Sequence, residues 1–452
     1  MAILDKHFNN VLIGNNSLSC MLGIGLLKSQ KKILLIEDER LHYGRLYSQN
    51  LGELEKNFLE VFGKDEGLDP LINVSQFLRH APLRFCVERS QLLLGRKPWQ
   101  NLVELNRKFP ELFDGGAVEY CQEIMSDKSL AEQFDELFYA TSKRIATSAV
   151  RVDGIEQLNF NLFLNQCPEK IKVFFDAFKK QVMSKDFVAH LYLWRSYYQQ
   201  QMTRNLAELE LFHLMLSLLA PRYELNETSL NAELLELCRQ HGGQFKSTSV
   251  REWKFHNRAP WCIELASFDG IIHPEMISFF GSGFEKTPFR AAESLERYRG
   301  LNLTWKLDPS ILERLKGQRI MGTQYKDLGT DGPWWMVDFH AESMDILVPI
   351  SHEPGLKTDF VLKNLRVKLK DWLRPWIGDY EKHLLHESVE LGPEIWVSSD
   401  RDPRFQGIGL VDASGPGQKK LLRNVYYYGP LNKRSMGLFS GLVAIKEAKN
   451  FA

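Results

Sequence analysis

The sequence predicts an α/β fold in which one domain is built from both ends of the chain. Near the N-terminus, residues 9–14 and 31–37 are short apolar runs on either side of an apolar segment at 17–29. This pattern is typical of a strand, a helix and a strand in a parallel sheet. Near the C-terminus, the strand-like run RNVYYYG precedes a final helix at 437–450. We therefore expect the chain to return to its first domain at its end.

Between these ends the pattern changes twice. From about 52 to 220 it is helical, as in QLLLGRKPWQNLVELNRKF and SLAEQFDELFYATSKRIA, which predicts an inserted helical subdomain. After Pro221, NETSLNAELLELCRQHGG predicts a helix, and runs such as QFKSTSVREWKF and WWMVDFHAES predict strands of a mixed sheet. The expected first domain comprises residues 1–60, 222–270 and 395–452, and the expected second domain comprises a helical insert at 61–221 and a mixed sheet at 271–394.

Composition and charge exclude several classes of function. The 452 residues include 57 basic and 57 acidic side chains, so no net field favours nucleic acid, and we expect no nucleic-acid partner. The N-terminus lacks a basic segment followed by an apolar core, and no run of about 18 uncharged apolar residues occurs. A cytoplasmic protein without a transmembrane segment is therefore expected.

The six cysteines form no CxxC pair and no cluster with histidine, so we predict no metal site and reduced, mostly buried thiols. One alternative concerns Cys20. It would lie at the start of the first helix, where a thiolate is stabilised, although packing in the core is the commoner role for such a residue.

The turn after the first strand has the spacing of a dinucleotide-binding fingerprint with two of its three glycines replaced. The fingerprint G-x-G-x-x-G makes a tight turn, lets the backbone approach a diphosphate and lets the helix pack closely on the strand. Here Gly14 is retained, and Asn16 and Ser19 occupy the other two positions. Both are small and polar, so both are candidates to donate hydrogen bonds to a phosphate or to cap the helix.

A carboxylate follows at the spacing expected for a nucleotide ribose. Glu37 ends the second strand, 23 residues after Gly14. In dinucleotide-binding domains an acidic residue near this distance binds the ribose hydroxyls. A strand-end glutamate is also common as a solvated charge, but its spacing from Gly14 favours the ligand interpretation.

The residues after Glu37 resemble one superfamily. The segment EDERLHYGRLYS is similar to a segment of FAD-dependent amine oxidases and phytoene-desaturase-like oxidoreductases, in which a G-G-R-x-x-S/T motif follows the glutamate, with Gly44, Arg45 and Ser48 in register and Tyr43 in place of the first glycine. The resemblance implies a Rossmann-like FAD-binding domain with a mixed β-sheet plus helical substrate domain. It also implies that Gly44 and Arg45 lie beside the FAD diphosphate.

Two further segments extend the resemblance. In ELLELCRQHGGQFKSTSVREW, Val250 occupies the position that lies near the adenine in the family, and it is equally typical of a buried strand. In NVYYYGPLNKRSMGLFSGLVAIKEA, Gly429, Ser440 and Gly441 match the closing FAD motif, whereas Pro430 replaces an expected acidic residue. The implied cofactor is FAD, and the implied binding residues include Val250, Gly429 and Gly441.

The resemblance implies an FAD-dependent oxidoreductase acting on a small amine or a lipophilic molecule. The sequence identifies no catalytic residue. Aromatic residues on predicted strands of the second domain, together with His340 as a proton carrier, are candidates to line a substrate cleft, although packing is their commoner role. These aromatic residues are Tyr325, Trp334, Trp335, Tyr426, Tyr427 and Tyr428.

A second family gives the alternative hypothesis. Rab GDP-dissociation inhibitors and escort proteins share the two-domain architecture, bind no flavin and carry a degenerate glycine motif followed by Tyr-Gly-Gly. His42, Tyr43 and Gly44 resemble that segment, whereas Arg45 fits the flavoproteins better. The alternative is a flavin-free relative without catalytic activity that binds a protein or lipid partner.

Overall fold

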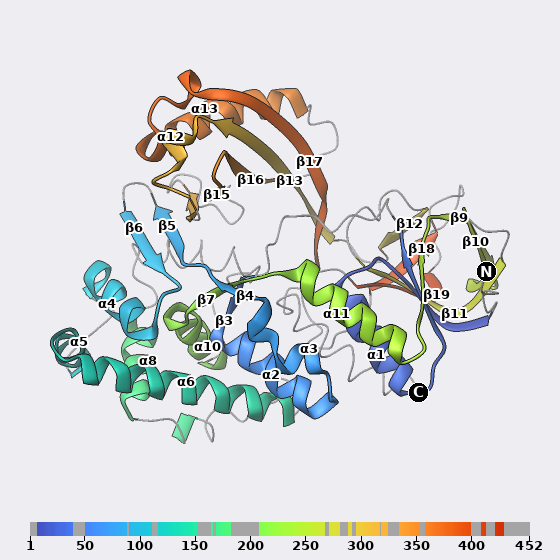
Figure 1. Ribbon diagram of the computed structural model, residues 1–452, viewed down its shortest axis with the longest axis horizontal. Helices are drawn as coiled ribbons and strands as arrows, with labels where there is room; N and C mark the ends of the chain where they lie inside the picture. The colour runs from blue at the N-terminus through green and yellow to red at the C-terminus, as the bar shows by residue number, and fades with distance from the viewer. Residues whose placement is uncertain are drawn as a thin grey trace.

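The computed structural model describes residues 7–38, 50–87, 90–110, 116–151, 164–165, 169–181, 208–266, 271–280, 288–291, 295–316, 318–323, 334–351, 358–398, 408–412 and 421–428. Within these residues the chain forms sheets of nine, seven and three strands with helices packed around them (Figure 1).

The nine-stranded sheet contains the predicted parallel unit, and we call it the first sheet. Its strands run in the order β12, β18, β19, β11, β1, β2, β8, and the β9–β10 hairpin is joined to it through β11. Strands β8, β2, β1, β11 and β19 are parallel to one another, whereas β18 is antiparallel to β19. This places the first strand in the middle, as in doubly wound dinucleotide-binding folds. The bounds are β1 His7–Ile13, β2 Ile33–Glu37, β8 Gln244–Ser247, β9 Val250–His256, β10 Ala259–Leu265, β11 Ile271–Phe280, β12 Phe289–Ala291, β18 Ile408–Asp412 and β19 Leu421–Tyr428.

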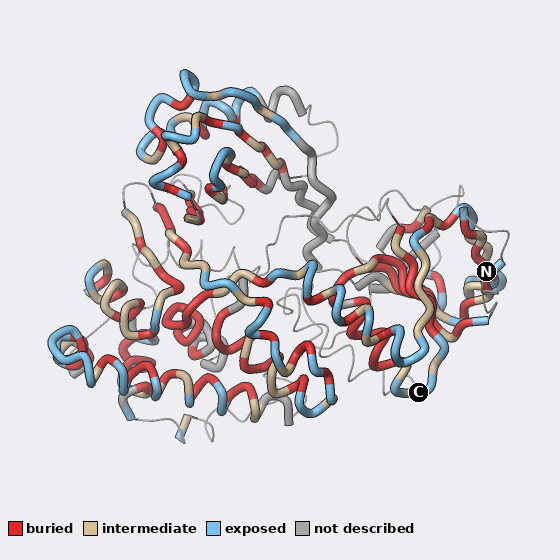
Figure 2. Tube along the Cα trace, in the orientation of Figure 1, coloured by how far each residue is buried: buried red, intermediate tan, exposed pale blue. Residues whose placement is uncertain are grey.

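Both faces of the first sheet are covered, which explains why its central strands are continuously apolar. Leu12 and Leu35 belong to a core cluster with apolar residues of α1 (Ser17–Lys28) and α11 (Glu227–Gln240). Val11 and Leu34 belong to another cluster, with residues of the β9–β10 hairpin such as Ile263. Figure 2 shows the central strands as a block of buried residues.

The seven-stranded sheet has the order β17, β13, β16, β15, β14, β5, β6, and we call it the second sheet. It is mixed, because β14 is parallel to β5 and antiparallel to β15. Trp305 and Val337 pack with Leu369 and Leu373 of α13 in its core. The bounds are β5 Leu83–Val87, β6 Ser90–Leu94, β13 Leu295–Leu307, β14 Arg319–Thr323, β15 Trp334–Phe339, β16 Ser343–Ser351, β17 Leu384–Ser398, α12 Pro309–Leu312, α13 Thr358–Ile377 and the 3-10 helix η6 Tyr380–Lys382.

A helical layer holds the three-stranded sheet, whose order is β3, β7, β4 (Figure 1). Phe134, Phe138, Phe175 and Phe212 are among its fully buried side chains. None of the described helices combines the length and apolarity that a membrane crossing requires. The bounds are α2 Glu53–Glu66, α3 Asp69–Ile72, η1 Val74–Phe77, α4 Pro98–Lys108, α5 Gly116–Ser126, α6 Lys128–Arg151, α8 Glu169–Gln181, α10 Glu208–Leu219, β3 Asn50–Gly52, β4 Leu78–His80 and β7 Arg222–Leu225.

The predicted fold class is confirmed, because the N-terminal unit and β19 near the C-terminus lie in one parallel sheet and the intervening chain forms a mixed sheet and a helical layer. The prediction of helix for the whole segment at 52–220 is wrong at β4, β5 and β6. A short apolar run such as QLLL does not by itself distinguish strand from helix, and its pairing with β5 decides the outcome. The expected end of a first-domain segment at residue 270 also differs from the structure. β11 begins directly after that residue, yet it lies between β1 and β19 in the nine-stranded sheet.

Candidate functional site

Gly14 forms the turn that joins β1 to α1. Its φ of +111° is one that L side chains rarely adopt, and its N–H donates to the carbonyl oxygen of Ile36 at 2.8 Å. A Cβ at this position would lie 2.1 Å from the carbonyl oxygen of Phe280, at the end of β11. Glycine is therefore required both for the backbone angle and for the close approach of the turn to β11.

Asn16 and Ser19 form a reciprocal capping box at the start of α1. The Ser19 N–H donates to Oδ1 of Asn16 at 2.9 Å, and the Asn16 N–H donates to Oγ of Ser19 at 3.0 Å. The Ser19 hydroxyl donates in turn to the Asn16 carbonyl oxygen at 2.8 Å. Two N–H groups that a helix start commonly offers to an anion are thus bonded within the chain.

Two other donors at the same helix start have no partner among the residues that the structure describes. Nδ2 of Asn16 and Oγ of Ser17 are both buried without a hydrogen bond to any of these residues. An unpaired buried donor costs about 1–3 kcal/mol, so this helix start is a place where an anionic oxygen would be stabilised. The residues therefore fit a diphosphate, with side-chain donors in place of the backbone of the missing glycine.

Glu37 lies at the end of β2 beside the same turn. Nδ2 of Asn15 donates to Oε1 of Glu37 at 3.3 Å, and Oδ1 of Asn15 accepts from Nδ2 of Asn231 on α11 at 3.0 Å. These bonds link the β1–α1 turn, the second strand and α11. Glu37, Asn15 and Asn16 all line one cleft.

Val250 does not line that cleft. It is buried in the core under the first sheet, and its N–H donates to Oδ2 of Asp38 at 3.3 Å. The structure therefore brings Gly14, Asn16, Ser19 and Glu37 together at one turn and leaves Val250 in the layer below.

The cleft has a volume of about 1130 Å³ and lies between the first sheet and the second sheet. Its floor includes the β1–α1 turn, Glu37 and the start of α11, and its far wall comes from β13, β14, β15 and β16. Most of the lining residues are polar or charged. In doubly wound folds, ligands bind at the carboxyl ends of the parallel strands, which is where this cleft opens.

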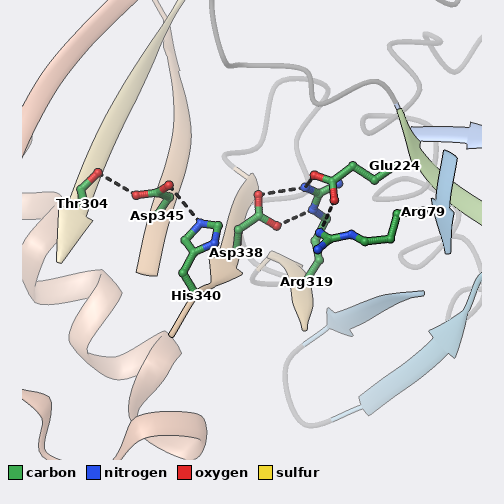
Figure 3. Close-up of polar contacts among 7 residues, drawn as sticks. All are labelled: Arg79, Glu224, Thr304, Arg319, Asp338, His340 and Asp345. Carbon is green, nitrogen blue, oxygen red and sulfur yellow. Dashed lines mark hydrogen bonds and ion pairs between the residues drawn. The ribbon is translucent and has the colours of Figure 1, made fainter. Parts of the chain in front are cut away.

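An ion-pair cluster spans the cleft from β14 to the three-stranded sheet (Figure 3). Arg319 is almost fully buried and pairs with both carboxylate oxygens of Asp338, and its Nη2 lies 3.3 Å from Oε1 of Glu224. Arg79 also pairs with Glu224. Burial alone would raise the pKa of Glu224, but the charges of Arg319 and Arg79 outweigh it and lower the pKa. Arginine within the apolar run RIMGT is the sequence signal that could have indicated this cluster.

His340 is the one sequence candidate for proton transfer that lies in the cleft with a defined partner. Its Nε2 is 3.1 Å from Oδ2 of Asp345, and Thr304 donates to Oδ1 of the same carboxylate at 2.7 Å (Figure 3). The hydrogen bond to Asp345 raises the pKa of His340, with partial burial opposing it. The imidazole therefore holds a proton more readily than a free histidine.

Glu227 is a titratable residue of the cleft that the sequence did not single out. It lies at the first position of α11, after the capping residue Asn226, and its Oε1 is buried without a hydrogen bond. Burial raises its pKa to about 7. A carboxyl group with such a pKa can accept or donate a proton near neutral pH, which is typical of catalytic sites. The sequence signal for it is a glutamate in the first helical turn directly after β7.

The remaining predicted cofactor residues lie outside the described residues. Gly44 and Arg45, with their neighbours His42, Tyr43 and Ser48, fall within 39–49, and Gly429, Pro430, Ser440 and Gly441 fall within 429–452. Their roles stay predictions. The final helix at 437–450 and Tyr325 also fall outside the described residues.

The prediction that strand aromatics line the cleft is wrong for Trp335. This side chain is buried in the core of the second sheet and stacks on Trp372, with ring centroids 5.8 Å apart. Tyr426 is partly buried against the core beneath α1, and it does not line the cleft. Both outcomes follow from the size of these rings, because burial of large aromatic surface is strongly favourable. The side chains of Trp334, Tyr427 and Tyr428 are not among those described.

The described cysteines are all buried free thiols: Cys20, Cys86, Cys121, Cys238 and Cys262. The hydrogen bond with Cys238 and burial raise the pKa of Cys20, so the thiolate hypothesis for this residue is wrong. Cys167 falls outside the described residues. Among the described residues no group of three or more His, Cys, Asp or Glu side chains is arranged to hold a metal ion.

Among the comparisons with known proteins, only the one with solved structures found similar proteins. No family model matches the chain, and no curated protein matches it. Solved structures that are similar to it include a Rab GDI from Plasmodium falciparum, at 10% identity over 98% of both chains with a TM-score of 0.49. They also include L-proline dehydrogenase from P. horikoshii, at 10% identity over 98% of this chain and 92% of that one with a TM-score of 0.42. Glycine oxidase from Geobacillus kaustophilus is 9% identical over 99% and 95%, with a TM-score of 0.43.

Proposed function

We propose that the chain is an FAD-dependent oxidoreductase that acts on a small amine. The observation that carries this proposal is the pair of unpaired buried donors, Asn16 Nδ2 and Ser17 Oγ, at the helix start beside Gly14. These donors would hold the diphosphate, and Glu37 would accept hydrogen bonds from the adenosine ribose. Bound flavin would supply hydride acceptance, which no side chain can provide.

The lining of the cleft favours an amine over a lipophilic substrate. Carboxylates outnumber arginines in it, and the two arginines, Arg79 and Arg319, are already paired with Glu224 and Asp338. A cleft with an excess of acidic side chains attracts a cation. A lipophilic molecule would have to displace water from charged walls, which is unfavourable.

Glu227 and His340 are the groups of this chain suited to move the protons of such a reaction. An amine must lose a proton before its C–H bond is oxidised, and the buried carboxylate of Glu227 would accept it. His340, held by Asp345, would carry protons between the cleft and solvent, since half of its side chain is exposed.

The direct test is the absorbance of the purified protein. We expect a yellow sample with oxidised-flavin bands that releases FAD on denaturation. A colourless sample that takes up no added FAD would contradict the proposal.

The placement of the diphosphate is tested by Asn16→Asp. Aspartate keeps the oxygen that caps α1 but removes the Nδ2 donor and adds a negative charge, so FAD binding should weaken about tenfold or more while the fold is retained. Asn364→Asp adds the same charge on the exposed surface of α13 and should leave FAD binding unchanged. Equal FAD affinity in the two variants would place the diphosphate elsewhere.

The second candidate is a flavin-free protein that binds a protein or lipid partner. The capping box favours it, because Asn16 and Ser19 already bond two of the N–H groups that a diphosphate would use. A colourless sample that takes up no FAD and whose thermal midpoint does not change with added FAD would support this candidate instead.

A further inference from the structure

A second cavity, separate from the cleft, has a volume of about 350 Å³ and is formed by β5, the β6–α4 segment and the end of α4. We call it the basic pocket. Four cationic side chains line it, namely Arg84, Arg96, Arg107 and Lys108, against one carboxylate, Glu104. Such an excess is notable in a chain with no net charge.

The single carboxylate is hydrogen-bonded to one of the four cations. Arg107 donates from Nε and Nη2 to the two oxygens of Glu104, both at 2.9 Å. Glu104 also accepts from the Leu93 N–H at 3.3 Å. Burial alone would raise the pKa of Glu104, but the bonds from Arg107 and Leu93 and the charges of Arg107 and Arg96 outweigh it and lower the pKa. Glu104 therefore stays ionised, and its one negative charge faces the four positive charges of the pocket.

Arg84 is held in place by neutral groups. Its Nη1 donates to Oε1 of Gln91 at 3.2 Å, and its guanidinium lies 5.3 Å from the centroid of the Trp376 ring. These contacts fix the plane of the guanidinium, and none of them comes from a carboxylate. Within the part of the chain that the structure describes, its Nε is buried without an acceptor.

Arg96 is fixed through its backbone. Its N–H donates to Oδ1 of Asn101 at 3.1 Å, and its carbonyl oxygen accepts from Nδ2 of Asn101 at 3.0 Å. Asn101 is itself fully buried and donates to the Leu219 carbonyl oxygen at 2.8 Å. The Nε of Arg96 is also buried, and no described residue accepts from it. The pocket thus contains the anchored guanidinium of Arg84 and that of Arg96 on an anchored backbone, and neither Nε has an acceptor among the described residues.

We propose that the basic pocket binds the phosphate group of a small phosphorylated molecule. Two guanidinium forks and one ammonium group need more acceptor oxygens than a carboxylate provides, whereas a phosphate group offers three or more in a tetrahedral arrangement. A small turn of either guanidinium would bring its Nε–H to such an oxygen. The volume exceeds that of a phosphate ion and leaves room for the group to which the phosphate is attached.

Isothermal titration of the full-length protein with phenyl phosphate, inorganic phosphate and benzoate tests this site. We expect saturable binding of phenyl phosphate and of inorganic phosphate, and binding of benzoate at least about tenfold weaker. Tighter binding of phenyl phosphate than of inorganic phosphate would assign the site to a phosphorylated molecule, whereas the reverse order would assign it to the free ion and overturn the proposal. Equal binding of benzoate would overturn the preference for phosphate.

Variants locate the site. Arg96→Gln and Lys108→Gln should each weaken phenyl phosphate binding about tenfold, and Arg96→Lys should weaken it less because the charge is kept. Arg314→Gln removes one exposed positive charge outside the pocket and should leave binding unchanged. Asn16→Asp, in the cleft, should also leave it unchanged. Loss of binding in Asn16→Asp with retention in Arg96→Gln would assign the phosphate to the cleft and overturn the proposal.

Discussion

The substitution Glu227→Gln tests the electrostatics of the cleft most directly. Burial raises the pKa of Glu227 from its ordinary 4.5 to about 7. Above pH 7 the folded chain must hold a carboxylate in a site that disfavours it, which corresponds to a loss of about 3 kcal/mol from the free energy of unfolding. Glutamine removes this loss, but it also removes a favourable charge in the first turn of α11, worth about 0.3–1 kcal/mol. The net gain at pH 8 should be about 2–3 kcal/mol.

The sign of the pH dependence follows from proton binding. Between pH 4.5 and pH 7 the folded state holds more protons at Glu227 than the unfolded state, so the wild-type chain loses stability as the pH rises through this window. Thermal midpoints of the wild type and the variant should therefore be close at pH 4.5 and separate at pH 8, with the variant higher. Glu233→Gln removes an exposed carboxyl from the same helix and should show no such separation. A constant difference between Glu227→Gln and wild type at both pH values would refute the argument.

Three further outcomes are expected in thermal unfolding. Gly14→Ala should lower the free energy of unfolding by about 3 kcal/mol or more, whereas Gly67→Ala, with a positive φ but nothing within 4 Å of its Cβ, should cost only about 1–2 kcal/mol. Equal losses would mean that the approach to Phe280 imposes no constraint. Arg319→Ala should cost about 3 kcal/mol because it leaves the partly buried Asp338 without its arginine and Glu224 with Arg79 alone, whereas Arg314→Ala at the surface should cost less than about 0.5 kcal/mol. In the wild type, ionised Glu224 contributes to the free energy of unfolding. This contribution should be complete above about pH 4.3 and should be lost as the pH falls through the lowered pKa of Glu224. The thermal midpoint should therefore fall in acid.

The parts of the fold that could be predicted are those with local signals. The N-terminal strand, helix and strand were predicted because their apolar runs are continuous and their turn carries Gly14. The spacing of Asn16 and Ser19 was also informative. A polar residue at the cap and a hydroxyl three residues later is the pattern of reciprocal capping, and this is what the two side chains do.

The parts that could not be predicted depend on pairing between distant segments. Arg319 and Glu224 are separated by 95 residues, and no sequence pattern around either residue indicates that it contacts the other. Strand β5 is short and precedes its parallel partner β14 by more than two hundred residues, and β6 pairs with β5, so local periodicity could not separate these strands from helix. Trp335 was a candidate for the cleft because it is an aromatic residue on a predicted strand of the second domain, and only the packing of α13 decides which face of that strand is covered.

The capping box at α1 has a consequence for how the protein is made. In many cofactor-dependent proteins the bound group contributes to folding, so the amount of folded chain follows the supply of the cofactor. Here Asn16 and Ser19 complete the start of the first helix with their own side chains. The start of α1 therefore has its shape without a bound group, and under the proposed function FAD would enter a site whose helix start is already formed.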